Sequence, residues 1–105
     1  MSSFDDRERA QEAKFAHDAE LRFKAEARRN KLLGLWAAEV MGKSDPAAYA
    51  AEVVSSDFEE AGDEDVFRKV SGDLAASGAS ISEADIRAKM AELIPVAQQQ
   101  VLEEG

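Results

Sequence analysis

The chain of 105 residues contains no cysteine, only one histidine and only two prolines. Without cysteine it has no disulfide framework, no thiolate nucleophile and no cysteine-ligated metal site, which suits a reducing compartment. No stretch approaches the roughly 18 consecutive apolar residues of a membrane-spanning helix, and the charged N-terminus lacks the apolar core of a secretory signal. We therefore expect a soluble, cytoplasmic protein that does not insert into a membrane.

Basic charge is also scarce, because 13 lysines and arginines stand against 22 aspartates and glutamates, for a net charge of −9. This balance disfavours nucleic acid and anionic lipid as main partners. The charge is unevenly divided: residues 1–31 hold eight basic and seven acidic side chains, and residues 32–105 hold five and fifteen. A near-neutral first third and an acidic remainder predict different surroundings for the two parts.

The dominant pattern in the sequence is the periodicity of an amphipathic helix. Apolar residues recur at spacings of three, four and seven, which places them on one face of a helix. The stripes lie in residues 21–41, 49–58, 66–74 and 86–101. Residues typical of helix caps stand at the ends of these segments. Asp45 and Ser82 stand where helices should begin, and Gly42, Gly62 and Gly78 stand where helices should end. No segment alternates like a strand, so we expect an all-α fold, a small four-helix bundle over residues 19–105.

Some residues in these stripes carry specific expectations. Gly34 marks either a close approach of two helices or a weak point, and Pro95 should kink or split the last helix. The stripe of residues 21–41 should consist of Leu21, Ala25, Leu32, Trp36 and Val40, flanked by Leu33, Ala37 and Met41. Aromatic residues at helical spacings should fill the core, namely Phe23, Trp36, Tyr49, Phe58 and Phe67.

The first helix is predicted to belong to one long helical segment over residues 4–41, whose first half has few apolar anchors. Only Phe4 and Phe15 are large and apolar in residues 1–18. Ion pairs four residues apart contribute roughly 0.2 to 0.5 kcal/mol each, whereas ordering the backbone costs about 1 to 2 kcal/mol per residue. We therefore expect residues 1–18 to be a flexible N-terminal arm that extends the first helix. Phe4 and Phe15 are candidate anchors for a partner groove, with packing on the bundle as the alternative.

No arrangement in the sequence predicts catalysis, a metal site or a cofactor. His17 has no cysteine or serine placed with it in a recognisable catalytic arrangement, and it is a candidate pH sensor or a solvated side chain. The acidic residues 57–65 lack the alternating spacing of a calcium loop, and Gly42-Lys43-Ser44 lacks the first glycine of a phosphate-binding loop. We expect a protein that is not an enzyme.

Several stretches of the chain resemble a known family. They are FDDRERAQEAKFAHDAE, KAEARRNKLLGLWAAEVMG, AGDEDVFRKV and IRAKMAEL. Together they are similar to the zeta-type inhibitor protein of alphaproteobacterial F-type ATP synthases, and the resemblance covers nearly the whole chain. Pro95 departs from the uninterrupted last helix expected of that family.

The resemblance implies a four-helix bundle whose N-terminal segment blocks the catalytic sector of the synthase and so inhibits ATP hydrolysis. That segment corresponds to residues 1–18, and the partners would be the alpha, beta and gamma subunits, with the protein peripheral to the membrane through the synthase. The residues implied in binding are Phe4, Asp5, Asp6, Arg7, Glu8, Arg9, Lys14 and Phe15. The alternative is a general adaptor or regulator that uses the acidic face of the bundle, with the arm as a solubilising tail.

Overall fold

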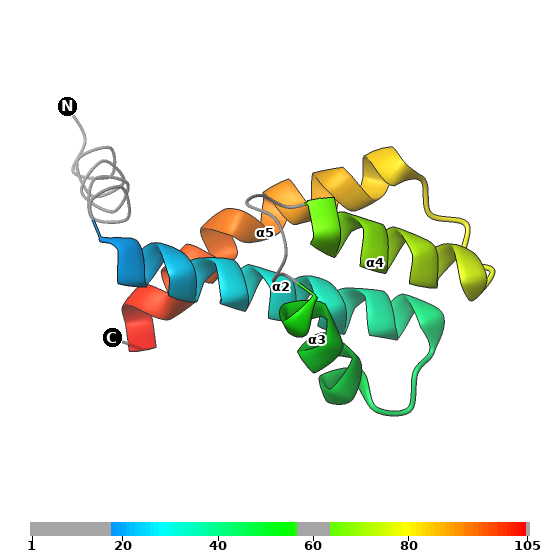
Figure 1. Ribbon diagram of the computed structural model, residues 1–105, viewed down its shortest axis with the longest axis horizontal. Helices are drawn as coiled ribbons and strands as arrows, with labels where there is room; N and C mark the ends of the chain where they lie inside the picture. The colour runs from blue at the N-terminus through cyan, green and yellow to red at the C-terminus, as the bar shows by residue number, and fades with distance from the viewer. Residues whose placement is uncertain (1–17, 57–63, 105) are drawn as a thin grey trace.

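The structure is a computed structural model that describes residues 18–56 and 64–104 (Figure 1). This part of the chain contains four helices and no strand, which confirms the all-α fold. The helices are α2 (Ala19–Met41), α3 (Pro46–Ser55), α4 (Glu64–Ala76) and α5 (Glu83–Glu104). The predicted roles of Phe58 and Gly62, and most of the acidic stretch 57–65, fall outside the described residues.

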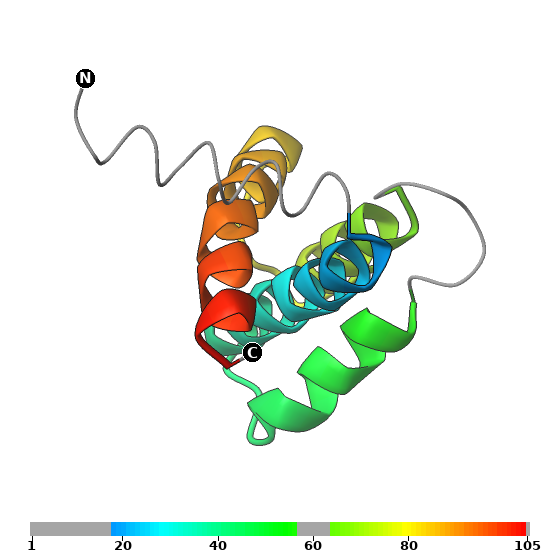
Figure 2. The same cartoon turned by 90° about the vertical axis from the view of Figure 1, so that its left-hand side faces the viewer.

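Helix α2 is the central element of the bundle. It contacts α3, α4 and α5, with its largest interfaces to α3 and α5. Figure 2 shows it among the three other helices, with α5 on one side and α3 on the other. In Figure 1, α2 and α4 run in one direction along the long axis and α5 returns in the other. The start of α2 therefore lies beside the end of α5.

The core is made by apolar residues from all four helices. The predicted stripe of α4 is confirmed, because Val66, Phe67, Val70 and Leu74 are all buried. Other helices contribute Leu33, Ala37, Ala38, Tyr49, Val53, Ile86 and Met90. A fully buried Val, Leu or Ile side chain stabilises the fold by about 1.5 to 3 kcal/mol. This cluster supplies the main driving force for folding.

The helix ends follow the capping signals in the sequence. The Asp45 carboxylate accepts a hydrogen bond from the N–H of Ala48, and Ser82 Oγ accepts one from the N–H of Asp85, at 3.2 and 3.1 Å. Gly42 and Gly78 have φ angles of 70° and 83°, the left-handed conformation that closes a helix without steric cost to glycine. The predicted boundaries at these four residues are confirmed.

Gly34 marks a close approach of α2 and α3. A Cβ atom placed on it would lie 2.6 Å from the Cα of Ala50 and 3.2 Å from Cγ2 of Val53. Only glycine allows the two backbones to come this near, so the first of the two expectations for this residue is confirmed.

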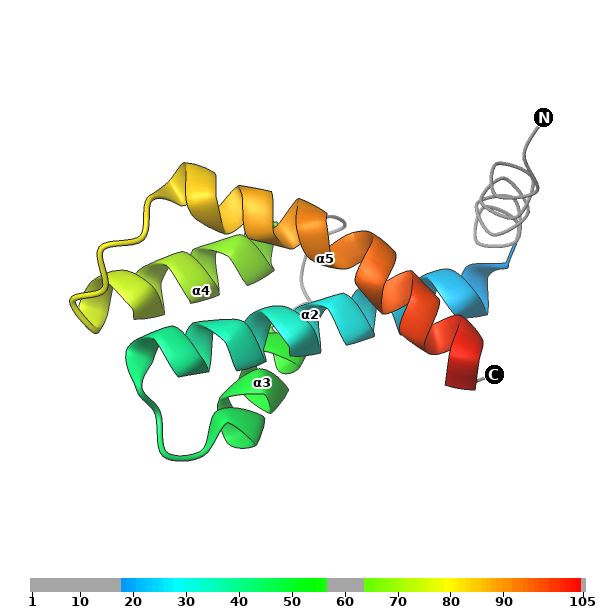
Figure 3. The ribbon, with the colours of Figure 1, turned by 180° about the vertical axis from the view of Figure 1, so that it is seen from behind.

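The expectation for the start of the first helix is wrong, and the structure decides between the two alternatives for Pro95. Asp18 has an extended backbone, with φ −112° and ψ 101°, so the helical segment predicted over residues 4–41 is interrupted there and α2 begins at Ala19. Helix α5 continues from Glu83 to Glu104 through Pro95, so it is not split. The ribbon of α5 changes direction in its middle part, as the alternative of a kink predicts (Figure 3). Pro95 is exposed, so the site of the kink lies on the solvent side of the helix.

The predicted aromatic core is correct for Tyr49 and Phe67, which are buried, and wrong for Phe23, which is 73% exposed. Trp36 is partly buried at the edge of the core, and the Lys89 ammonium lies 5.6 Å from the centroid of its ring. The expected stripe of α2 is also shifted. Leu33 and Ala37 are fully buried, whereas Val40 is 38% exposed. The reason is that α2 packs against three helices, so that no single face is its core face.

Candidate protein-interaction surface

The body of the protein begins at Asp18. Its Oδ1 accepts a hydrogen bond from the N–H of Leu21 at 3.1 Å and so satisfies one of the free donors in the first turn of α2. The residues predicted to bind a partner precede this cap and lie outside the described residues: Phe4, Asp5, Asp6, Arg7, Glu8, Arg9, Lys14 and Phe15, with the candidate pH sensor His17. Their contacts remain predictions. The described element that follows them directly in the sequence is α2.

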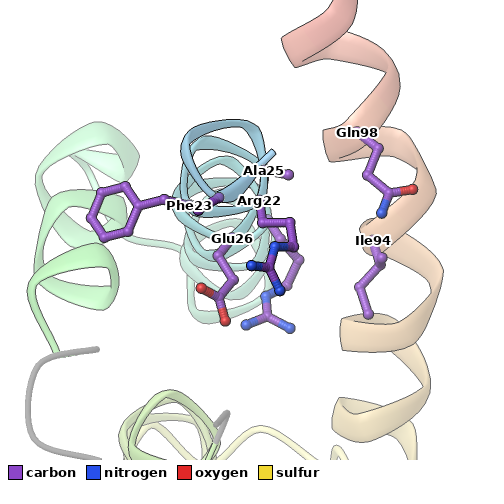
Figure 4. Close-up of a pocket in the computed structure, with 8 residues that line it drawn as sticks. Arg22, Phe23, Ala25, Glu26, Ile94 and Gln98 are labelled. Atoms are coloured by element: carbon purple, nitrogen blue, oxygen red, sulfur yellow. The ribbon is translucent and has the colours of Figure 1, made fainter. Parts of the chain in front are cut away.

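Phe23 is the most exposed large apolar side chain of this surface. Figure 4 shows that its ring extends from α2 on the side away from α5, while Ile94 and Gln98 extend from α5 toward α2. The sequence offered a signal for this position. Phe23 is two residues after Leu21 and two before Ala25, so it stands about 200° around the helix from both. It therefore lies off the stripe that those two residues define.

A groove of mixed polarity lies between α2 and α5, with a volume of about 440 Å³. Its lining residues are Ala19, Arg22, Phe23, Ala25, Glu26, Arg29, Ile94 and Gln98. Arg29 is only 3% exposed, and its Nε donates a hydrogen bond to Oδ1 of the buried Asn30 at 2.8 Å. A charge this deeply buried is costly unless it is hydrogen-bonded, so this interaction belongs to the packing of α2.

A second groove lies on the other side of Phe23, between α2, the end of α3 and the end of α5. Its volume is about 570 Å³. Its lining residues are Leu21, Phe23, Lys24, Ala27, Arg28, Lys31, Val54, Val101 and Glu104. The lining combines five apolar residues with three basic residues and one acidic residue. We call it the basic groove, because three of its four charged residues are basic, whereas the chain after position 31 is predominantly acidic.

Arg28 fixes one wall of the basic groove. Its Nη1 donates a hydrogen bond to Oε1 of Gln100 at 2.9 Å, and its Nη2 forms an ion pair with Glu104. These contacts join the first half of α2 to the last turns of α5. Within α2, Lys24 forms an ion pair with Glu20 at 3.3 Å. The shape of the groove is thus set by interactions between side chains of α2 and α5.

A different polar cluster joins α3 to α4 at the other end of the body. The hydroxyl of Tyr49 donates a hydrogen bond to Oδ2 of Asp73 at 2.9 Å, and Lys69 Nζ lies 3.1 Å from the same oxygen. Burial of the phenol raises the pKa of Tyr49, and the hydrogen bond and negative charge of Asp73 raise it further. Tyr49 thus remains a neutral donor, and the cluster stabilises packing.

The described residues offer no arrangement for metal chemistry, since residues 18–56 and 64–104 contain no group of three metal-ligating side chains. Among the four helices of this part of the chain, none is both long and apolar enough to cross a membrane. The features that the structure does bring together are the exposed Phe23, two grooves and a local excess of basic charge. Such features are typical of a surface that binds another protein.

Comparison with known proteins identifies the family. A family model described as ATPase inhibitor subunit zeta matches residues 1–100. Four solved chains match; one, a solution NMR structure, has 59% sequence identity and a TM-score of 0.72, and the alignment covers 81% of this chain and 99% of that one. The search of curated proteins gave no match. Since the family model spans nearly the whole sequence, the chain belongs to the family of the ATPase inhibitor subunit zeta.

Proposed function

We propose that the protein inhibits ATP hydrolysis by the catalytic sector of an F-type ATP synthase and is a regulatory protein, not an enzyme. The observation that carries this proposal is the family match over residues 1–100, which includes both the arm and the body. The residues that precede Asp18 fold as a helix into a crevice between catalytic subunits and block rotation. The partners are the alpha, beta and gamma subunits, which hold the protein at the cytoplasmic face of the membrane.

The position of the helix cap supports a division of labour between arm and body. Asp18 closes the first turn of α2, so the body has its own helix start without residues 1–17. The arm is near neutral but dense in charges of both signs, which suits a subunit surface that also carries both signs. Binding would bury the rings of Phe4 and Phe15, each worth roughly 1.5 to 3 kcal/mol if fully removed from water.

Burial of those two rings decides whether the arm binds, because ordering the arm on binding costs free energy. Fixing the backbone of each arm residue costs about 1 to 2 kcal/mol, and helix hydrogen bonds and ion pairs recover only part of it. His17 directly precedes the cap residue in the sequence, and histidine is the residue type whose ordinary charge change lies closest to neutral pH, so we propose it as the group through which pH affects inhibition.

The test is a titration of steady-state ATP hydrolysis by the isolated catalytic sector with four proteins. They are the full chain, a chain lacking residues 1–17, Phe15→Ala, and the control Val40→Ala in the described body. Deletion and Phe15→Ala should abolish inhibition, whereas Val40→Ala should inhibit like the full chain. Asp18 is retained so that α2 keeps its cap, and circular dichroism should show unchanged melting of the truncated body. Equal inhibition by the truncated chain would favour an adaptor that uses the bundle face.

A further inference from the structure

The basic groove differs from the rest of the body in both polarity and charge. Residues 32–105 carry three acidic side chains for each basic one, whereas the groove has Lys24, Arg28 and Lys31 against Glu104 alone. Ion pairs to Glu20 and Glu104 offset part of this charge, and Lys31 is exposed at the rim. A carboxylate brought to this rim would meet basic groups in an otherwise repulsive field.

We infer that the basic groove is a second docking site for the catalytic sector of the synthase, and that it binds a subunit helix whose apolar face is flanked by carboxylates. The inference rests on the proposed function and extends it from the arm to the body. The apolar floor, from Leu21, Val54 and Val101 on three helices, fits the apolar side chains of such a helix. The exposed ring of Phe23 covers the edge of that helix and loses water on binding.

The position of the groove explains why its partner belongs to the complex that holds the arm. Leu21 is three residues after the cap at Asp18, a rise of about 5 Å along α2. A subunit surface that receives the arm up to the cap must therefore continue beside the groove. Once the arm is bound, docking of the groove becomes an intramolecular step with a high effective concentration, and it strengthens binding without any change in the arm.

Two substitutions on this surface test the inference in the full chain, each with a matched exposed control, one near the C-terminal end of α2 and one just after it. Phe23→Ala is paired with Val40→Ala, and Lys31→Glu is paired with Lys43→Glu. Phe23→Ala and Lys31→Glu should raise the concentration for half-maximal inhibition at least tenfold. Maximal inhibition should be unchanged because the arm is intact. The deficit of Lys31→Glu should shrink at high salt, because it arises from charge. Both controls should behave like the parent.

The outcomes separate this inference from the proposed function. If the parent chain does not inhibit hydrolysis, the proposed function fails. If the parent inhibits and Phe23→Ala and Lys31→Glu are as potent as it is, the arm acts alone and the docking site is refuted. Both side chains are exposed in the body, and a thermal melt of each variant checks that the fold is retained.

A photo-crosslinking amino acid, benzoylphenylalanine replacing Phe23 in the full chain, identifies the occupant of the groove directly. In the inhibited complex it should crosslink to an alpha, beta or gamma subunit. A crosslink to a second copy of the chain would assign the groove to self-association and overturn the inference. A crosslink within the same chain, to its own arm, would overturn it as well.

Discussion

The substitution Gly34→Ala tests the closest helix contact in the body. Gly34 lies where α2 meets α3, and an added Cβ would stand 2.6 Å from the Cα of Ala50. Carbon atoms in ordinary contact are about 3.5 to 4.0 Å apart, so α3 would have to move away by roughly 1 Å. The obstacle is a backbone atom, which cannot turn aside as a flexible side chain can.

Two opposing terms determine the size of the effect. Alanine is favoured over glycine in a helix interior by about 1 kcal/mol, and overpacking a core costs typically 1 to 3 kcal/mol. Since this overlap is with backbone, we take the upper part of that range. The free energy of unfolding should then fall by about 1 to 2 kcal/mol, and the melting temperature by roughly 5 to 15 °C, for a domain of this size.

Gly72→Ala is the matched control, because Gly72 lies inside α4, is exposed, and would place a Cβ with nothing within 4 Å. It should gain about 0.5 to 1 kcal/mol from helix propensity alone. Urea denaturation and thermal melts followed by circular dichroism measure both variants. If Gly34→Ala is as stabilising as Gly72→Ala, α2 and α3 do not approach as closely as the structure describes.

Two further predictions concern the polar contacts. The raised pKa of Tyr49 means that its contribution to stability is complete below the unfolded value of about 10 and is lost as pH rises above it. Stability above that pH should therefore fall less in Tyr49→Phe, and tyrosinate absorption, which reports Tyr49 alone because the chain has one tyrosine, should appear only with unfolding. Early ionisation in the folded chain would contradict this. Arg28→Ala should cost about 1 kcal/mol in urea denaturation and speed hydrogen exchange in the last turns of α5, because the contacts to Gln100 and Glu104 are lost. Unchanged exchange there would refute that role.

Most of the architecture could be predicted because its signals are local. The caps at Asp45, Ser82, Gly42 and Gly78 follow from the chemistry of one or two residues, and they fixed the helix ends. The stripe of α4 was correct because that helix offers one apolar face to the core. In these places the sequence pattern and the packing depend on the same residues.

The rest could not be predicted because it depends on neighbours distant in sequence. Helix α2 is enclosed by three helices, so its burial follows the arrangement of those helices and not one periodic stripe. Leu33 is therefore buried more deeply than the predicted centre of the stripe, and Phe23 is exposed. Gly34 likewise had two interpretations until the position of Ala50 decided between them. The basic groove consists of residues from α2, α3 and α5, and no sequence window contains all three.

The boundary in charge at residue 31 does not coincide with the boundary between the arm and the body, which lies at Asp18. Residues 1–31 are near neutral as a set, yet residues 1–17 hold three basic and four acidic side chains, and residues 18–31 hold five and three. The positive excess therefore belongs to the first half of α2, which is part of the body, and not to the arm. Lys24, Arg28 and Lys31 from this half also line the groove beside Phe23. If inhibition depends on charge recognition, charge-neutralising substitutions in α2 should therefore change the salt dependence of inhibition more than charge-neutralising substitutions before Asp18.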